Sequence, residues 1–177
     1  IDLRATKDDD LVLFQEPEVD CLTEGQGLVR DHTVAQLKKL DFGYWVYKDK
    51  DRYPLRGSGV GKIVTLREVL KKFPHKNFLL NPKDRDLNSF KFLVKILGEF
   101  PQKDYSAFSY WGSYEGYVWL KRSIKNYGNF IANHHQSAPC FEAWKSLGLF
   151  GVWPEECRNK SFSLNMAQVN VNWWGFP

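Results

Sequence analysis

The sequence contains little sulfur and no pattern of cysteines that would cross-link it. Only three of its 177 residues are cysteine, and one is methionine. The cysteines, Cys21, Cys140 and Cys157, are far apart and odd in number, so they provide neither a disulfide framework nor the CxxC spacing of a metal site. We therefore expect each to pack as an ordinary side chain, and they leave the redox compartment undetermined.

Long apolar runs are absent as well. No stretch approaches the roughly 18–20 apolar residues that cross a membrane, and no signal-peptide pattern stands at the start. The sequence thus predicts no transmembrane segment and leaves the localisation unknown. The formal net charge of +4 is spread along the chain, and the densest basic run, residues 121–125, is typical of a solvated helix face. Without a nucleic-acid motif, we expect no nucleic-acid partner.

Aromatic residues, by contrast, are abundant. The chain has 7 Trp, 8 Tyr and 13 Phe, within a composition that is 43% hydrophobic and 26% charged. This length and composition predict a single globular domain over residues 1–177. The rings favour a core or interface rich in aromatic contacts, and a module that binds sugars or lipid headgroups is the alternative.

Predicted strands alternate with predicted helices along the chain. The expected strands are 1–5, 11–15, 77–80, 105–109, 130–133, 149–153 and 167–173. The expected helices are 32–40 with Asp31 as N-cap, 66–73 with Thr65 as N-cap, one that begins after Asp86, 114–126 and 139–147. Such strand–helix units imply an α/β fold with a parallel sheet, either open and doubly wound or closed as a (β/α) barrel. The glycine-rich segment 57–62 lacks the strand-to-helix context of a phosphate-binding loop, so we expect a flexible loop there.

The first half of the chain carries several motifs in a recognisable order. It begins with Ile1–Asp8 and the strand Leu11–Gln15, followed by Glu16 and Pro17. Further matching segments are Leu22–Val29, His32–Asp41, Ile63–Leu70 and Leu80–Lys83. In this order and spacing they resemble the glycerophosphodiester phosphodiesterase family, and the resemblance fades after about Tyr110.

The resemblance implies a TIM-type (β/α) barrel with its site at the C-terminal ends of the strands. The chain opens within the family's second strand, so we expect a partial barrel whose first strand, and possibly last strand, lie outside this sequence. Open edges of such a barrel need covering, which predicts more chain or a protein partner there.

The resemblance also assigns chemistry to individual residues. Family members bind Mg²⁺ or Ca²⁺ through carboxylates and use histidines as general acid and base, with a lysine near the phosphate. Asp2 matches a metal ligand and Lys83 matches the lysine. Asn81 stands where a third metal carboxylate is expected, and Gln15-Glu16 stands where the family has His-Asp. Glutamine cannot carry a proton near neutral pH as histidine does.

These substitutions leave two functional hypotheses. The first is a phosphodiesterase-like domain that has lost catalysis and serves a structural or assembly role. The second is an active, metal-dependent enzyme that hydrolyses glycerophosphodiesters to glycerol 3-phosphate and an alcohol, with its missing residues upstream. Under either hypothesis the candidate catalytic positions are Gln15 and Lys83, the candidate metal positions are Asp2 and Asn81, and Glu16 is a further candidate.

Overall fold

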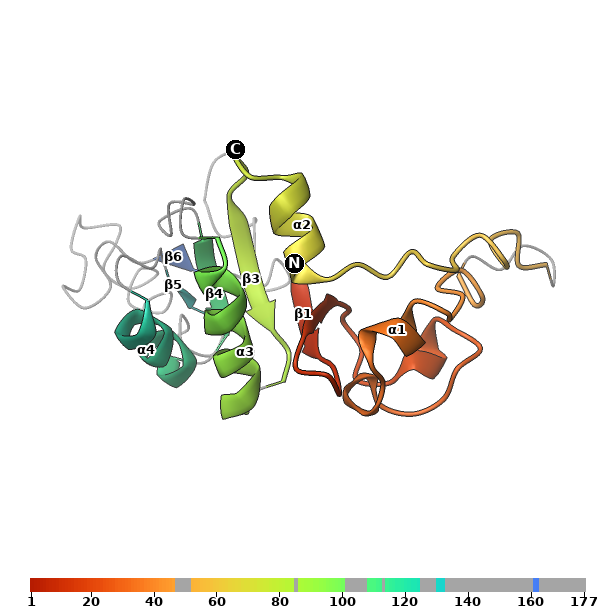
Figure 1. Cartoon of the computed structure of the whole chain (residues 1–177), viewed down its shortest axis with the longest axis horizontal. Helices are drawn as coiled ribbons and strands as arrows, with labels where there is room; N and C mark the ends of the chain where they lie inside the picture. Colours follow the sequence, from red (N-terminus) through yellow and green to blue (C-terminus); the bar gives the residue numbers. More distant parts are fainter. Residues whose placement is uncertain are drawn as a thin grey trace, which may run out of the picture.

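A computed structural model describes residues 1–46, 52–84, 86–100, 108–112, 114–124, 130–132 and 161–162. Its centre is one sheet with the strand order β2-β1-β3-β4-β5-β6 (Figure 1). All neighbouring strands are parallel except β1 and β2, which form an antiparallel hairpin. The strands are β1 (Asp2–Ala5), β2 (Leu11–Leu13), β3 (Phe78–Pro82), β4 (Phe108–Gly112), β5 (Phe130–Ala132) and β6 (Ser161–Phe162).

The helices α2 (Leu66–Lys72), α3 (Leu87–Gly98) and α4 (Tyr114–Ser123) connect the strands (Figure 1). They pack on one face of the sheet and share a single core. Its members are Leu3, Ala5, Leu11, Leu66, Leu70, Leu80, Phe90, Leu93, Ile96, Leu97, Phe108, Tyr110, Leu120 and Ile124. A doubly wound sheet places helices on both faces. Here α2, α3 and α4, the helices that connect the strands, all lie on one, as in the wall of a barrel.

The starts of α2 and α3 follow directly from the sequence. The Thr65 hydroxyl accepts a hydrogen bond from the N–H of Glu68, and the Glu68 carboxylate accepts one from the N–H of Thr65. At α3, Asp86 accepts a hydrogen bond from the N–H of Ser89. Each contact satisfies a backbone donor that the first helical turn leaves free, so both predicted N-caps are confirmed.

A second apolar cluster lies between the segment that connects β2 to α2 and the face of β2 that points away from the first core. This segment contains the 3-10 turns η1 (Val19–Cys21) and η2 (Val29–Asp31) and the short helix α1 (Val34–Leu37), beside the β1–β2 hairpin (Figure 1). The buried members of the cluster are Val12, Phe14, Val19, Val29, Leu37 and Ile63. Alternate side chains of β2 therefore serve two cores, with Leu11 under the helices and Val12 under this segment.

Several predicted boundaries were wrong. The helix expected over 32–40 is only α1, and its N-cap is Thr33, not Asp31, because Thr33 and Gln36 form a capping box while Asp31 belongs to η2. The strand expected at 105–109 is β4, which extends to Gly112. The strand β6 was not predicted. The elements expected at 139–147, 149–153 and 167–173 lie outside the described residues.

The free edge of β2 is covered by the chain itself. The N–H of Leu13 donates to the carbonyl of Val64 at 3.0 Å, and Val12 pairs with Thr65 in an antiparallel bridge. The segment that leads into α2 thereby occupies hydrogen-bonding groups that would otherwise be open to another strand. In the described part of the chain, no helix is long and apolar enough to cross a membrane.

Candidate active site

The structure brings Asp2, Asn81 and Lys83 together at the C-terminal end of β3. Asp2 lies directly opposite Asn81 in the parallel register of β1 and β3. The Asn81 amide nitrogen donates a hydrogen bond to Oδ1 of Asp2 at 2.5 Å, and Nζ of Lys83 lies 3.5 Å from the same oxygen. Asn81 is buried, whereas the Asp2 and Lys83 side chains are 31% and 26% exposed, so ligand can reach the two charged groups.

This arrangement does not fit a divalent cation as it stands. Mg²⁺ and Ca²⁺ require several oxygen ligands, usually including one or more carboxylates. Here one oxygen of the Asp2 carboxylate is bound by an amide N–H and lies beside an ammonium group. Within the described residues, no three His, Cys, Asp or Glu side chains come together as a metal site. Asp2 is the carboxylate that the sequence resemblance matched to a metal ligand, and here it is bound by Asn81 and Lys83 instead.

Gln15 and Glu16 are held near Asp2 through their backbone. Arg4 donates from Nε to both their carbonyl oxygens at 3.1 Å, and from a terminal nitrogen to Gln15 at 2.8 Å. The preceding N–H, from Phe14, donates to the carbonyl of Asp2 at 3.2 Å. The Gln15 side chain is exposed and that of Glu16 is half-buried, so neither is sequestered in the core.

Arg4 is itself fixed by Asp84, which follows β3. A guanidinium nitrogen lies 2.7 Å from the Asp84 carboxylate, and the other Asp84 oxygen accepts a hydrogen bond from the N–H of Ala5 at 2.8 Å. Both side chains of the ion pair are shielded, at 13% and 15% exposure. The pair therefore couples the loop of Gln15 to the end of β3. The sequence did not indicate this pair, because Arg4 and Asp84 are far apart in the chain and Asp84 lies just outside the segments that carry the family resemblance.

Trp111 is a further residue near the site that the sequence did not single out. It lies at the end of β4, and the Lys83 ammonium is 5.8 Å from the centre of its ring. The indole nitrogen is buried and has no hydrogen-bond partner among the described residues. Burying a donor without a partner costs free energy of folding. Because Trp111 lies next to Lys83, its indole N–H is a further polar group near the site.

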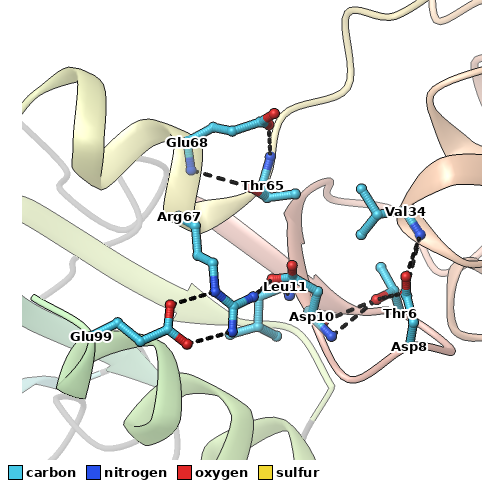
Figure 2. Close-up of polar contacts among 9 residues, drawn as sticks. All are labelled: Thr6, Asp8, Asp10, Leu11, Val34, Thr65, Arg67, Glu68 and Glu99. Carbon is cyan, nitrogen blue, oxygen red and sulfur yellow. Dashed lines mark hydrogen bonds and ion pairs between the residues drawn. The ribbon is translucent and has the colours of Figure 1, made fainter.

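The acidic turn after β1 has a structural role. Asp8 accepts hydrogen bonds from the Thr6 hydroxyl and from the N–H of Val34, the first residue of α1 (Figure 2). Asp10 lies 2.6 Å from a guanidinium nitrogen of Arg67, which also binds Glu99 through two hydrogen bonds (Figure 2). The hydrogen bond from Arg67 holds the pKa of Glu99 below its usual value. The turn thus joins β1 to α1 and α2.

Comparison with known proteins supports the resemblance seen in the sequence. The profile of the glycerophosphoryl diester phosphodiesterase family matches residues 1–90. A glycerophosphodiester phosphodiesterase of Bacillus subtilis is 40% identical over 90 residues, which cover 49% of this chain and 30% of that protein. One from Caldanaerobacter subterraneus is 36% identical over 81 residues, covering 46% of this chain and 30% of its own length. The matched region is thus under a third of these relatives.

Solved structures extend the similarity of fold over most of the chain. A glycerophosphoryl diester phosphodiesterase domain from Mycobacterium tuberculosis superposes with a TM-score of 0.65 at 16% identity, covering 88% of this chain and 55% of that one. A phosphodiesterase of Oleispira antarctica, solved with its product sn-glycerol-3-phosphate, gives 0.57 at 22% identity and covers 84% and 59%. This chain spans a little over half of these proteins.

These similarities decide between the two arrangements of the sheet. The neighbours are TIM barrels, and the parallel strands and one-sided helices described above correspond to part of such a barrel. The match over residues 1–90 includes the turn after β1, the Gln15-Glu16 position and the β3 end with Asn81 and Lys83. The chain belongs to the glycerophosphoryl diester phosphodiesterase family.

Proposed function

We propose that this chain is a phosphodiesterase-family domain that has lost the family's hydrolytic chemistry and acts as a structural or assembly component. The observation that supports this most directly is the direct hydrogen bond from Asn81 to Asp2, with Lys83 beside it. In this family a carboxylate is expected at the position of Asn81. The amide occupies the Asp2 oxygen that would otherwise serve a cation, and it removes one negative charge from the site.

Gln15 supports the same proposal. Its neutral side chain has no protonation equilibrium near pH 7, so it cannot replace a histidine as general acid or base. The backbone of the loop that carries Gln15 is nevertheless fixed by hydrogen bonds from Arg4 to the Gln15 carbonyl. A supported loop that carries an inert residue is consistent with a pseudoenzyme on an intact scaffold.

An active enzyme is the alternative. Asp2 and Lys83 are both present and close together, and Lys83 could place positive charge near a phosphate oxygen. In this case the substrate would be a glycerophosphodiester, the products glycerol 3-phosphate and an alcohol, and the cation Mg²⁺ or Ca²⁺. The Asn81 amide would have to turn its oxygen to the cation, and another group would have to move the proton.

The test is release of glycerol 3-phosphate from glycerophosphocholine by the full-length protein, with Mg²⁺ or Ca²⁺ and with EDTA. The variants Gln15→His and Gln15→Asn are assayed in parallel, the second as a control that cannot carry a proton. No turnover by the parent or Gln15→Asn, with metal-dependent turnover by Gln15→His, would support an inactivated site. Turnover by the parent that Asp2→Ala abolishes would refute the proposal and support the active enzyme.

The assembly role predicts a protein partner that covers open edges of a partial barrel. The partner's presence is tested on protein purified from its native source by size-exclusion chromatography with light scattering. A mass equal to that of one chain would argue against an assembly role, while a larger and defined mass would support it.

A further inference from the structure

Three aromatic rings surround a cation at the surface of the segment between β2 and α2. The guanidinium carbon of Arg56 lies 4.2 Å from the ring centres of both Tyr44 and Tyr53, and 4.9 Å from that of Trp45. The rings meet nearly at right angles, with centres 4.8 Å apart for Tyr44–Trp45 and 5.4 Å apart for Trp45–Tyr53. We call Tyr44, Trp45 and Tyr53 the aromatic cage.

The backbone beneath the cage is fixed by a buried carboxylate. Asp41 is 5% exposed and accepts hydrogen bonds from the N–H groups of Gly43, Gly57 and Gly59 at 3.0, 2.5 and 2.9 Å. These contacts join the segment that carries Tyr44 and Trp45 to the segment that follows Arg56. A Cβ at Gly59 would lie 2.1 Å from the backbone nitrogen of Gly43. The two segments therefore approach each other too closely for any side chain at residue 59.

Trp45 is anchored separately. The backbone N–H of Trp45 donates to the carbonyl of Leu22, after η1, at 3.5 Å. The backbone N–H of Tyr44 donates to the carbonyl of Asp41 at 3.1 Å. Trp45 is nevertheless 44% exposed. An aromatic residue whose backbone is fixed in this way and which stays open to solvent is available to a ligand.

We propose that the aromatic cage is a binding site for a quaternary ammonium group, and that Arg56 occupies it as an internal competitor. Faces of aromatic rings attract cations, and several rings around one position are the usual means of recognising quaternary ammonium. Such a group has no N–H donors, so it gains little from carboxylates and much from rings. The side chain of Arg56 is exposed; apart from the rings, it donates a hydrogen bond from Nε to the carbonyl of Tyr44 at 3.0 Å and is attracted by the charge of Asp41. It can therefore leave without opening the core.

This inference is independent of the proposed loss of catalysis. The cage residues lie outside the set formed by Asp2, Asn81, Lys83 and Gln15. Its test uses choline itself, which has no phosphodiester bond, so the result does not depend on hydrolysis.

Choline is titrated into the protein, and binding is followed by the upfield shift and saturation transfer of its N-methyl protons. We expect weak binding to the parent and about two- to fivefold tighter binding to Arg56→Ala, because an exposed arginine–ring contact has this strength. Trp45→Ala should lose most of the binding. Lys62→Ala, which removes an exposed positive charge outside the cage, should bind like the parent and controls for net charge.

The uncharged isostere 3,3-dimethyl-1-butanol separates a cation site from an apolar one. It should bind markedly more weakly than choline to Arg56→Ala. Equal binding of the two compounds, or no choline binding to any folded variant, would overturn the proposal. If circular dichroism shows that Arg56→Ala is unfolded, Arg56→Gln, which keeps a donor for the Tyr44 carbonyl, takes its place and must bind choline more tightly than the parent.

Discussion

Asn81 donates its side-chain amide to the carboxylate of Asp2 across two parallel strands, at 2.5 Å. The family resemblance predicts a pair of carboxylates at these positions, where this chain has one carboxylate and a neutral amide donor. Two adjacent carboxylates repel each other unless a cation lies between them, whereas an amide and a carboxylate are stable together without one. The same strand register can therefore hold either a metal site or a metal-free contact, depending on residue 81.

Asn81→Glu should recreate the dependence on metal. Without a cation, the variant loses the hydrogen bond and gains like charges, and we expect it to be less stable by about 1–3 kcal/mol. Mg²⁺ or Ca²⁺ at about ten times its dissociation constant should restore about 1.4 kcal/mol. Thermal unfolding with EDTA and with each cation measures both effects. Asn81→Gln, the neutral control, should show no gain from either cation, and a gain of the same size there would contradict the explanation.

Arg4 should be more important for stability than its position on a short strand suggests. Arg4→Ala leaves the shielded Asp84 carboxylate without its partner and frees the Gln15 and Glu16 carbonyls, so we expect a loss of about 2–4 kcal/mol in the free energy of unfolding. Arg4→Lys should recover only part of it, since an ammonium cannot reproduce the fork of the guanidinium. Urea denaturation provides the measurement.

The matched control for Arg4 is Arg30. It pairs with Asp86 at the same 2.7 Å distance, but the two side chains are 52% and 37% exposed. Arg30→Ala should therefore change the free energy of unfolding by about 1 kcal/mol or less. Similar losses in Arg4→Ala and Arg30→Ala would show that the shielding of Arg4 is not what makes it important.

Most contacts between near neighbours in the sequence were predictable, whereas contacts across the fold were not. Thr65 and Asp86 were correctly identified as N-caps, because a cap binds a backbone N–H three residues ahead, although at α1 the cap is Thr33 and not the predicted Asp31. The proximity of Asp2 to Asn81 and Lys83 followed from the resemblance. The Arg4–Asp84 pair and the role of Asp41 required distant segments to be placed first.

The glycine-rich segment shows the same limit. The sequence predicted a flexible loop at residues 57–62, because they lack the strand-to-helix context of a phosphate-binding loop. The structure shows Gly57 and Gly59 bound to one buried carboxylate from residue 41. Nothing near residue 57 in the sequence indicates that acceptor, since the partner lies 16 residues away.

Asp9 adopts a backbone conformation that suits glycine better. Its φ is +60°, in the left-handed region, at the turn between β1 and β2. A side chain in this region is strained, although Asp tolerates it better than most residues. We expect Asp9→Gly to have equal or up to about 1 kcal/mol greater stability, and Asp9→Val to lose about 1–2 kcal/mol. Thermal unfolding tests the ranking, with Asp9→Asn as the control expected to match the parent; a Val variant as stable as the parent would refute it.

Asp41 should make stability depend on acidic pH. Hydrogen bonds from the backbone N–H of Gly57, and also of Gly43 and Gly59, hold the pKa of the Asp41 carboxyl below its usual value. A group with a lowered folded pKa stabilises the protein above its unfolded pKa of about 3.9, and this contribution is lost as the pH falls through the folded pKa. Asp41→Asn should therefore lower the melting temperature most near pH 6–7.

The gap between parent and Asp41→Asn should shrink as the pH falls below about 4, because protonation removes the same charge from the parent that the substitution removes from the variant. Melting temperatures from pH 2.5 to 7 measure this convergence. Asp20→Asn, on the exposed side of η1, is the control; its small difference from the parent should show no such convergence. A gap for Asp41→Asn that stays constant down to pH 2.5 would mean that its charge is not what holds the three N–H groups.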